Sequence, residues 1–282
     1  LDKAGYNAWR EFYVNDAGNQ IEKFGCSLEA RYLQIFKGDE IEFPEDGYQG
    51  EDIKDLAKEY ADLNGDSLVN VSAEERKKAL VDYALPKNIK KMQADMEKYK
   101  IFYDKWFFES ELHKSGAVKA VVDLLTEKGL TYEKDGAVWY KNKEVLTQKL
   151  LKEGKSQKYI DNLELKDDVL IRQNGNPTYF TADIAYHKNK FDRGFTTLID
   201  VWGADHHGHV MRMKGAMDAI GYDGDKLNVV LMQLVKLVKD GELVKMSKRT
   251  GKAIQLGDLL DEVPVDSARF LFNTKAANTQ MD

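Results

Sequence analysis

The sequence has little that would mark a secreted, thiolate-bound or membrane protein. Its single cysteine, Cys26, can form no internal disulfide and has no second thiol with which to share a metal ion. No apolar run approaches the roughly 20 residues needed to cross a bilayer. The first residues also lack the basic segment and apolar core of a secretory signal. These absences predict a cytoplasmic protein with a buried or inert cysteine and no membrane segment.

An excess of basic residues is also missing. The net charge is −6 and the isoelectric point about 5.6, which excludes a nucleic-acid surface over the whole chain and leaves only local contacts with RNA. The 282 residues are 43% hydrophobic and 32% charged, enough apolar material for one or two domains with a sizeable core. Leu1–Gly5 is typical of the last turn of a helix that glycine ends, so we expect a fragment of a longer chain.

The first half of the chain carries mainly helical patterns. Residues 9–14 form a short aromatic and β-branched run that predicts a strand, and residues 21–36 predict a helix. Apolar residues recur at helical spacing from Ile53 to Leu63. The stretch from 73 to about 128 is heavily charged and nearly free of Gly and Pro, which predicts a helical layer. We interpret the aromatic cluster Trp106–Phe108 as core of this layer, with a ligand platform as the alternative.

The second half alternates short strands with helices. Apolar residues on both sides of Asp135-Gly136 predict a hairpin between Thr131 and Lys143. Apolar strands at residues 169–171, 198–202 and 229–232 are separated by helical segments, the pattern of a parallel sheet with crossovers. The sequence therefore predicts an α/β fold.

The clearest predicted helix follows the second of these strands. Val210, Met213, Met217 and Ile220 form one apolar stripe, and Gly221 ends the helix. The beginning of this helix lies just past the carboxyl edge of the predicted sheet, where α/β folds place ligands and where the helix dipole favours anions.

That strand-to-helix corner contains Gly203, Asp205, His206, His207 and His209. Three histidines and an aspartate in five residues allow a zinc or manganese site as one interpretation. The alternative is a polar corner that holds an adenosine and an amino acid, with Gly203 allowing close approach of the backbone.

The most specific motif is Lys245-Met246-Ser247-Lys248-Arg249, which follows a predicted hairpin through Asp240-Gly241. Three cations within five residues suit the phosphates of a nucleotide in a step that expels pyrophosphate. A basic surface turn is the alternative that charge alone would favour.

A second constellation is Pro177–His187, at a strand-to-helix junction. Tyr179 and Asp183 are four residues apart, so in a helix their side chains share a face. Such a pair suits a planar guanidinium, because the carboxylate accepts two parallel hydrogen bonds while the phenol offers a stacking face or a hydroxyl. The alternative is an acidic residue near a helix N-terminus beside a core tyrosine.

In order along the chain, several motifs resemble those of bacterial arginyl-tRNA synthetases, which are class I aminoacyl-tRNA synthetases. The resemblance covers essentially the whole length and is carried by Tyr13–Gln20, Trp106–Glu109, Gly136–Trp139, Tyr179–His187, Gly203–Gly208 and the lysine loop Lys245–Arg249. It implies a Rossmann-like nucleotide-binding fold with a parallel sheet and a largely helical insertion. The sequence His206–His209 has the shape of the histidine signature of this class. It lies too close to Lys245 for that role.

The resemblance also implies the roles of particular residues. Tyr179 and Asp183 would bind the arginine guanidinium. A polar residue of the Asp205-His206 corner would help to hold the substrate, and the resemblance leaves open which of Asp205, His206 and His207 makes the contact. ATP, accompanied by Mg²⁺, would be bound by Gly203, Asp205, His206, Met246 and Ser247 together with Lys245 and Lys248, which would be the catalytic residues. The further partner is tRNA(Arg), and no resident metal ion is expected.

The family comparison predicts the organisation of the chain as well. Residues 1–44 would be a remnant of the first half of the catalytic fold, 45–165 a mainly helical insertion, 166–262 the second half with the lysine loop, and 263–282 the start of a helical stem. The histidine signature and the outer tRNA-binding domains do not fit into these residues, so we expect a monomeric, truncated and inactive catalytic core.

Two other classes of function compete with this interpretation. Asp205-His206-His207 spells the signature triplet of a metal-dependent phosphoesterase at a strand end. That class needs further Asp and His ligands, for which His113 and His187 are the only other histidines. A non-catalytic RNA-binding relative is the second alternative, and the intact lysine loop argues against it.

Overall fold

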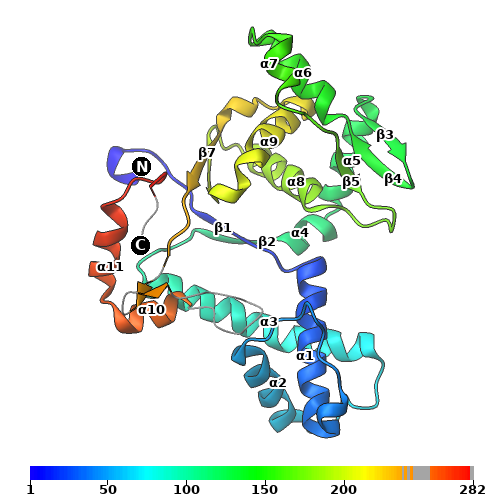
Figure 1. The fold of residues 1–282 in the computed structure, drawn as a ribbon, viewed down its shortest axis with the longest axis vertical. Coiled ribbons are helices and arrows are strands. Elements are labelled where there is room, and N and C mark those ends of the chain that lie inside the picture. The colour runs from blue at the N-terminus through cyan, green and yellow to red at the C-terminus, as the bar shows by residue number, and fades with distance from the viewer. Residues whose placement is uncertain (237, 240–241, 244–254, 280–282) are drawn as a thin grey trace. The chain divides into compact units, whose positions relative to one another are not determined.

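The computed structural model describes residues 1–236, 238–239, 242–243 and 255–279, which form a mixed α/β protein (Figure 1). The chain divides into two units. The first contains Leu1–Phe108 and Lys236–Lys275, and the second contains Glu109–Val235 with a short segment that begins at Ala276. No helix within these described ranges is both long enough and apolar enough to cross a membrane.

Three helices form the core of the first unit. α1 packs against α2 and α3, and a buried cluster that includes Leu28, Ile53 and Leu80 fills the space between them. The fully buried Tyr32 accepts from the Leu68 amide and donates its hydroxyl to the Gly65 carbonyl at 2.8 Å. The predicted helix at 21–36 is confirmed. The helices and strands of this unit are η1 Asp2–Ala4, β1 Glu11–Val14, α1 Asn19–Lys37, η2 Gly38–Glu40, α2 Glu51–Asn64, α3 Ala73–Lys98, β2 Lys105–Phe108, β8 Val238–Lys239, β9 Glu242–Leu243, α10 Leu256–Glu262 and α11 Val265–Asn273.

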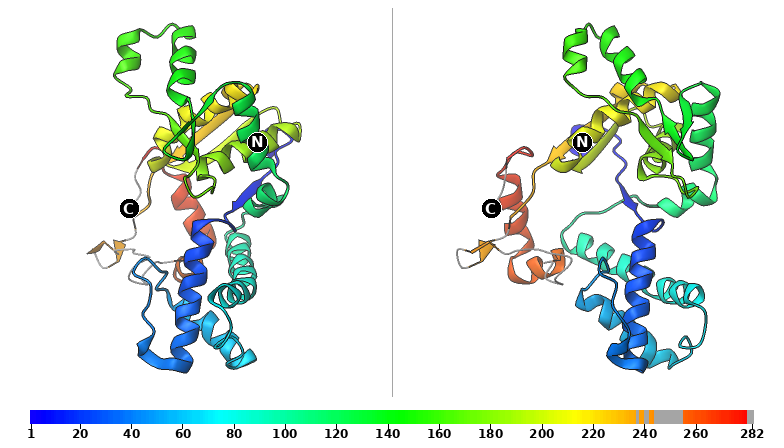
Figure 2. Two further views of the ribbon diagram at one scale, coloured as in Figure 1. Left: turned by 90° about the vertical axis from the view of Figure 1, so that its right-hand side faces the viewer. Right: turned by 45° about the vertical axis from the view of Figure 1, so that its right-hand side comes forward.

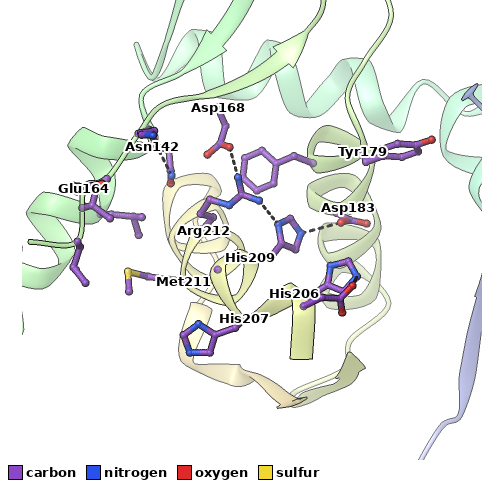
Figure 3. A pocket seen from close by; sticks show the side chains of 17 residues that line it. Asn142, Glu164, Asp168, Tyr179, Asp183, His206, His207, His209, Met211 and Arg212 are labelled. Atoms are coloured by element: carbon purple, nitrogen blue, oxygen red, sulfur yellow. Dashed lines mark hydrogen bonds and ion pairs between the residues drawn. The ribbon is translucent and has the colours of Figure 1, made fainter. Parts of the chain in front are cut away.

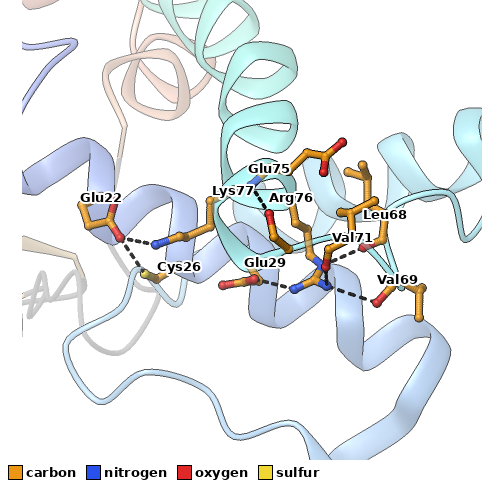
Figure 4. A network of polar contacts seen from close by, with 10 residues as sticks. Glu22, Cys26, Glu29, Leu68, Val69, Val71, Glu75, Arg76 and Lys77 are labelled. Atoms are coloured by element: carbon orange, nitrogen blue, oxygen red, sulfur yellow. Dashed lines mark hydrogen bonds and ion pairs between the residues drawn. The ribbon is translucent and has the colours of Figure 1, made fainter.

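One buried guanidinium fixes the loop between α2 and α3. Arg76 donates to the carbonyls of Leu68, Val69 and Val71, and its Nη1 lies 2.7 Å from the Glu29 carboxylate on α1 (Figure 4). The Arg76 side chain is 9% exposed and that of Glu29 17%. A single side chain therefore joins α1, the loop and the beginning of α3.

The aromatic cluster at 106–108 was expected in a helix, and this expectation is wrong. These residues belong to β2, which pairs in parallel with β1 in the register Phe12 to Trp106 and Tyr13 to Phe107. Phe107 is 1% exposed, so the expectation that this aromatic is core is confirmed. The strand is formed by pairing with β1, which lies more than 90 residues earlier in the chain. Local charge and spacing cannot reveal such a pairing.

The second unit holds two sheets and the helices around them. Its elements are α4 Glu109–Lys114, α5 Ala117–Glu127, β3 Thr131–Lys134, β4 Ala137–Tyr140, α6 Asn142–Lys152, α7 Gln157–Asp161, β5 Asp168–Ile171, α8 Tyr179–Asp192, β6 Leu198–Gly203, η3 Ala204–His206, α9 His207–Ile220, η4 Gly224–Lys226 and β7 Leu227–Met232. The predicted hairpin is confirmed, with positive φ at both Asp135 (52°) and Gly136 (72°), the conformation that a two-residue turn of this kind requires.

The strand at 169–171 was expected in the parallel sheet, and this is also wrong. It is part of β5, which pairs antiparallel with β4 and so extends the hairpin to three strands. The composition of a short apolar strand does not indicate whether it pairs in parallel or antiparallel. Here a parallel neighbour would need a crossover connection, whereas β4 is available nearby for antiparallel pairing.

The two later predicted strands do form a parallel pair. β6 and β7 run in register from Leu198 opposite Leu227 to Gly203 opposite Met232, and α9 connects them (Figure 2). Met213 and Met217 of α9 are fully buried, and Gly221 ends the helix in the left-handed region with φ of 100°. This βαβ arrangement places the beginning of α9 at the carboxyl end of β6.

Candidate functional site

A cavity of about 810 Å³ lies inside the second unit (Figure 3). This volume is within the range of roughly 300–1,000 Å³ that is typical of small-molecule sites. Side chains from α6, β5, α8, η3 and α9 line it. The predicted site residues Tyr179, Asp183, Asp205 and His206 all lie on its wall, whereas Lys245–Arg249 and the turn Asp240-Gly241 lie outside the described residues.

The first turns of α8 carry Tyr179 and Asp183. Two threonine hydroxyls anchor this end of the helix, since Thr178 donates to the Val169 carbonyl at 2.7 Å and Thr181 donates to the Leu170 carbonyl at 2.8 Å. Both acceptors belong to β5, so the helix start is tied to the antiparallel sheet. Tyr179 is 42% exposed, and the Asp183 side chain is 35% exposed. Both side chains are therefore accessible to a ligand.

The corner after β6 forms another wall of the cavity. Asp205, His206 and His207 are all exposed, and His206 Nε2 lies 3.9 Å from the Asp205 carboxylate. A side chain at Gly203 would place its Cβ 2.5 Å from Asp205 Oδ1. Glycine at this position therefore lets the Asp205 carboxylate lie against the end of the strand.

A chain of polar contacts runs along the cavity wall from α8 to β5. His209 Nε2 lies 3.0 Å from Asp183 Oδ2, and His209 Nδ1 lies 2.9 Å from Arg212 Nη2. Arg212 Nη1 in turn donates to Asp168 Oδ1 at 2.6 Å (Figure 3). We call these four residues the Asp183–Asp168 relay. Two of them, Arg212 and Asp168, were not singled out from the sequence, although the spacing of His209 and Arg212 places them on one helix face.

The inner end of the relay is electrostatically unusual. Burial raises the pKa of Asp168, and the charge of Arg212 and its hydrogen bond oppose this effect. In the part of the chain that the structure describes, Asp168 Oδ2, Arg212 Nε and Asn142 Oδ1 are buried without a hydrogen-bond partner. Residues that line the cavity thus have buried polar atoms whose hydrogen-bonding capacity is not used by the protein.

A second polar network lies further along α8. His187 Nε2 contacts the Asp200 carboxylate of β6, and Lys190 Nζ lies 2.8 Å from the other oxygen of that carboxylate. Burial alone would raise the pKa of Asp200, but the hydrogen bonds and charges of His187 and Lys190 outweigh it and hold the pKa far below its ordinary range. This network joins α8 to β6 beneath the candidate site.

The histidines of the corner do not gather around one point. His209 is engaged with Asp183 and Arg212, whereas His206 lies beside Asp205. Across residues 1–236, 238–239, 242–243 and 255–279, no group of three or more His, Cys, Asp or Glu side chains is arranged to hold a metal ion.

This fold and site define a class of protein. A family described as "tRNA synthetases class I (R), catalytic domain" matches residues 1–282, and the chain belongs to this class I tRNA synthetase family. Within the class, the curated relatives compared are named arginine–tRNA ligases. Proteins named arginine–tRNA ligase from Ruminiclostridium cellulolyticum and Caldanaerobacter subterraneus subsp. tengcongensis are 55% and 56% identical to it over 284 and 283 residues. The family expected from the motifs, that of the arginyl-tRNA synthetases, is confirmed.

Solved structures agree with this assignment. An arginyl-tRNA synthetase structure from Campylobacter jejuni has a TM-score of 0.80 and 36% identity, covering 98% of this chain and 56% of that one. The Thermus thermophilus enzyme, at 17% identity and a TM-score of 0.64 over 100% of this chain and 54% of its own, shows the same fold. The chain covers 47% of the two curated relatives, so it spans about half of their length.

Proposed function

We propose that this chain contributes the arginine-binding part of an arginine–tRNA ligase. The observation that carries the proposal is the Asp183 carboxylate, which lies on the wall of a cavity of ligand size beside Tyr179 and is held by His209. A carboxylate suits the guanidinium fork because it accepts two parallel charge-assisted hydrogen bonds. Tyr179 would add a stacking face or a hydroxyl from the preceding turn of α8.

The proposed reaction has two steps. The carboxylate of arginine attacks the α-phosphorus of ATP and displaces pyrophosphate, forming arginyl-adenylate. A terminal ribose hydroxyl of tRNA(Arg) then attacks the arginyl carbonyl and displaces AMP. The chain supplies positioning and charge stabilisation for these steps, since the bonds that form and break belong to the substrates.

ATP is proposed to lie at the corner after β6. Gly203 would allow close approach of the nucleotide, and Asp205 and His206 would contact ATP or arginine. Lys245, Met246, Ser247 and Lys248 would bind its phosphates, with Lys245 and Lys248 stabilising the charge that develops on pyrophosphate. Magnesium is proposed to arrive with ATP, because Mg²⁺ is commonly held through substrate phosphates.

The wider organisation also stays a proposal. We propose that the whole protein is a cytoplasmic monomer. Residues 45–165 would be the insertion between 1–44 and 166–262, the two parts of the catalytic fold, and 263–282 would begin the stem. Contact with tRNA(Arg) would be made mostly by parts of the relatives' length that this chain does not span.

Arginine-dependent exchange of pyrophosphate into ATP, with tRNA(Arg) present, tests the proposed function. It is measured in the protein encoded by the complete reading frame that contains this chain. Exchange that requires arginine and does not respond to lysine or citrulline is expected. Manganese-stimulated phosphodiester hydrolysis without such exchange would favour the phosphoesterase alternative instead.

A further inference from the structure

The Asp183–Asp168 relay has a direction that its hydrogen bonds determine. A guanidinium can only donate, so the Arg212 Nη2 contact at 2.9 Å requires His209 Nδ1 to be the acceptor. The proton of a neutral imidazole must then be on Nε2, which faces Asp183 Oδ2 at 3.0 Å. His209 is thus held as a neutral ring that donates to Asp183 and accepts from Arg212.

Aromatic packing fixes the plane of the same ring. The His209 ring packs edge-on against Phe180 at 5.6 Å between centroids and lies 5.2 Å from the Trp202 ring. The guanidinium carbon of Arg212 lies 5.4 Å from the Phe180 centroid. With its side chain 12% exposed, His209 has its orientation set from α8, β6 and its own helix.

A neutral donor at position 209 leaves the negative charge of Asp183 intact, which a cation at that position would not do. Lysine or arginine at position 209 would orient Asp183 but would also cancel its charge. The imidazole occupies one lone pair of Oδ2 and leaves the other acceptor sites of the carboxylate, about three in all, and its full negative charge. The nearby charge of Arg212 is balanced by Asp168, at 2.6 Å.

We propose that His209, with its tautomer set by Arg212, is a positioning residue that aims the anionic Asp183 carboxylate at the guanidinium of the substrate. The inference rests on the proposed function, in which Asp183 binds arginine. It adds a residue that touches no substrate and acts through Asp183. Because a preoriented carboxylate loses no rotamer freedom on binding, the effect falls on arginine recognition.

Three substitutions of His209 distinguish the effect of its hydrogen bond to Asp183 from the effect of its ring packing. His209→Phe keeps a flat ring against Phe180 and Trp202 but removes both hydrogen bonds. His209→Gln places an amide nitrogen near Nε2, where it can donate to Asp183, while its oxygen can accept from Arg212. His209→Asn reaches only as far as Nδ1, so it keeps the contact with Arg212 and lacks the donor to Asp183. Glutamine and asparagine differ by one methylene, so their comparison holds even where phenylalanine impairs folding.

The measurement is arginine-dependent pyrophosphate exchange in the complete reading frame, with the Michaelis constants for arginine and ATP determined separately. His209→Phe and His209→Asn should raise the KM for arginine about 10- to 100-fold, the scale of one hydrogen bond to a charged group. The KM for ATP and kcat should change less than about threefold. His209→Gln should recover most of the loss.

A double-mutant cycle tests whether His209 acts through Asp183. In an Asp183→Asn background, His209→Phe should add little further change to the KM for arginine, because the charge that it orients is already gone. The inference would be overturned if the effects of the two substitutions on the KM for arginine multiplied in full. It would also be overturned if His209→Phe changed that KM by less than twofold, or if His209→Gln bound arginine no better than His209→Asn. Absence of arginine-dependent exchange in the unaltered protein, or an Asp183→Asn variant with normal arginine kinetics, would instead refute the proposed function.

Discussion

At the scale of single residues, Asp183 combines access with orientation. Its side chain is 35% exposed, so a ligand can reach it, yet one oxygen is held by His209. Tyr179, one turn earlier on α8, is more open at 42% exposure. The two residues therefore suit different parts of one interaction, the carboxylate for charge and geometry and the phenol for an additional contact.

Replacing Asp183 with asparagine is expected to weaken the use of arginine by orders of magnitude. The substitution leaves the guanidinium without its partner in a partly desolvated pocket, a loss of about 2–5 kcal/mol. Tyr179→Ala should have the same effect more mildly, because it removes no charge. The measurement is the KM for arginine in pyrophosphate exchange, with the KM for ATP close to normal.

Asp192→Asn is the matched control for this prediction. It makes the same chemical change on the same helix, but Asp192 is exposed and contacts Lys188 and Tyr222 outside the cavity. Its arginine kinetics should stay near normal. Near-native arginine kinetics for Asp183→Asn would move the leading assignment to the corner at Asp205 and His206.

A further prediction about single residues concerns Lys245 and Lys248, which lie outside the described residues. Changing either to alanine should lower the rate of arginine activation much more than it weakens arginine binding, because in the proposed function their charges would act on pyrophosphate as it leaves. The expected loss is roughly 2–4 kcal/mol of transition-state stabilisation. An effect confined to the KM for arginine would contradict this role. Pre-steady-state measurement of adenylate formation separates the two quantities.

At the scale of elements, α8 is the support of the site. Its beginning is tied to β5 by Thr178 and Thr181, and its middle is tied to β6 by the contact of His187 with Asp200. Asp183 projects into the cavity between these two attachments, so its position depends on both sheets. The polar residues under the site thus hold the helix that carries it.

The contact between α8 and β6 should make stability depend on pH. Because His187 and Lys190 overcome the effect of burial and lower the pKa of folded Asp200, its stabilisation is complete above the unfolded value of about 3.9. It is lost as the pH falls towards the folded pKa. Urea denaturation at pH 7 should therefore show a large loss of stability for Asp200→Asn, and the difference from the unaltered chain should shrink below pH 4. A difference that stayed constant down to pH 2 would contradict this origin.

The stability of the loop between α2 and α3 should depend on Arg76. Arg76→Met removes four hydrogen bonds made by a buried guanidinium and leaves the partly buried Glu29 carboxylate without its cation, which costs about 3–5 kcal/mol. Urea denaturation measures this loss. Lys78→Met on the same helix is the control, because the Lys78 side chain is 75% exposed and its pair with Asp82 contributes little. Equal effects of the two substitutions would show that burial of Arg76 does not matter.

At the scale of the whole molecule, the chain spans about half of the relatives that it matches. We expect the 282-residue chain by itself to show no arginine-dependent pyrophosphate exchange, with or without tRNA. The protein from the complete reading frame should show it. The same assay on both proteins, at equal concentration, checks the expectation, and robust exchange by the shorter protein would contradict it.

Much of the site could be anticipated from the sequence because its key residues lie close together along the chain. Tyr179 and Asp183 need only helical geometry to share a face, and Gly203, Asp205 and His206 need only a strand that leads into a helix. Each of these arrangements involves contacts over a few residues. The Asp135-Gly136 turn and the end of α9 at Gly221 were predictable for the same reason.

What only the tertiary structure decided involves residues far apart in sequence. The pairing of β1 with β2, the antiparallel partner of β5, and the contacts from Asp183 through His209 and Arg212 to Asp168 each join segments tens of residues apart. Short strands and single polar residues have many acceptable partners, and the selection among them is made by packing of the whole chain. By itself, the sequence determined the family, the α/β class and the local geometry of the motifs. The tertiary structure decided which carboxylate His209 holds and which sheets support the beginning and the middle of α8. Hydrogen bonds between residues so far apart in sequence form only when the core brings their partners together.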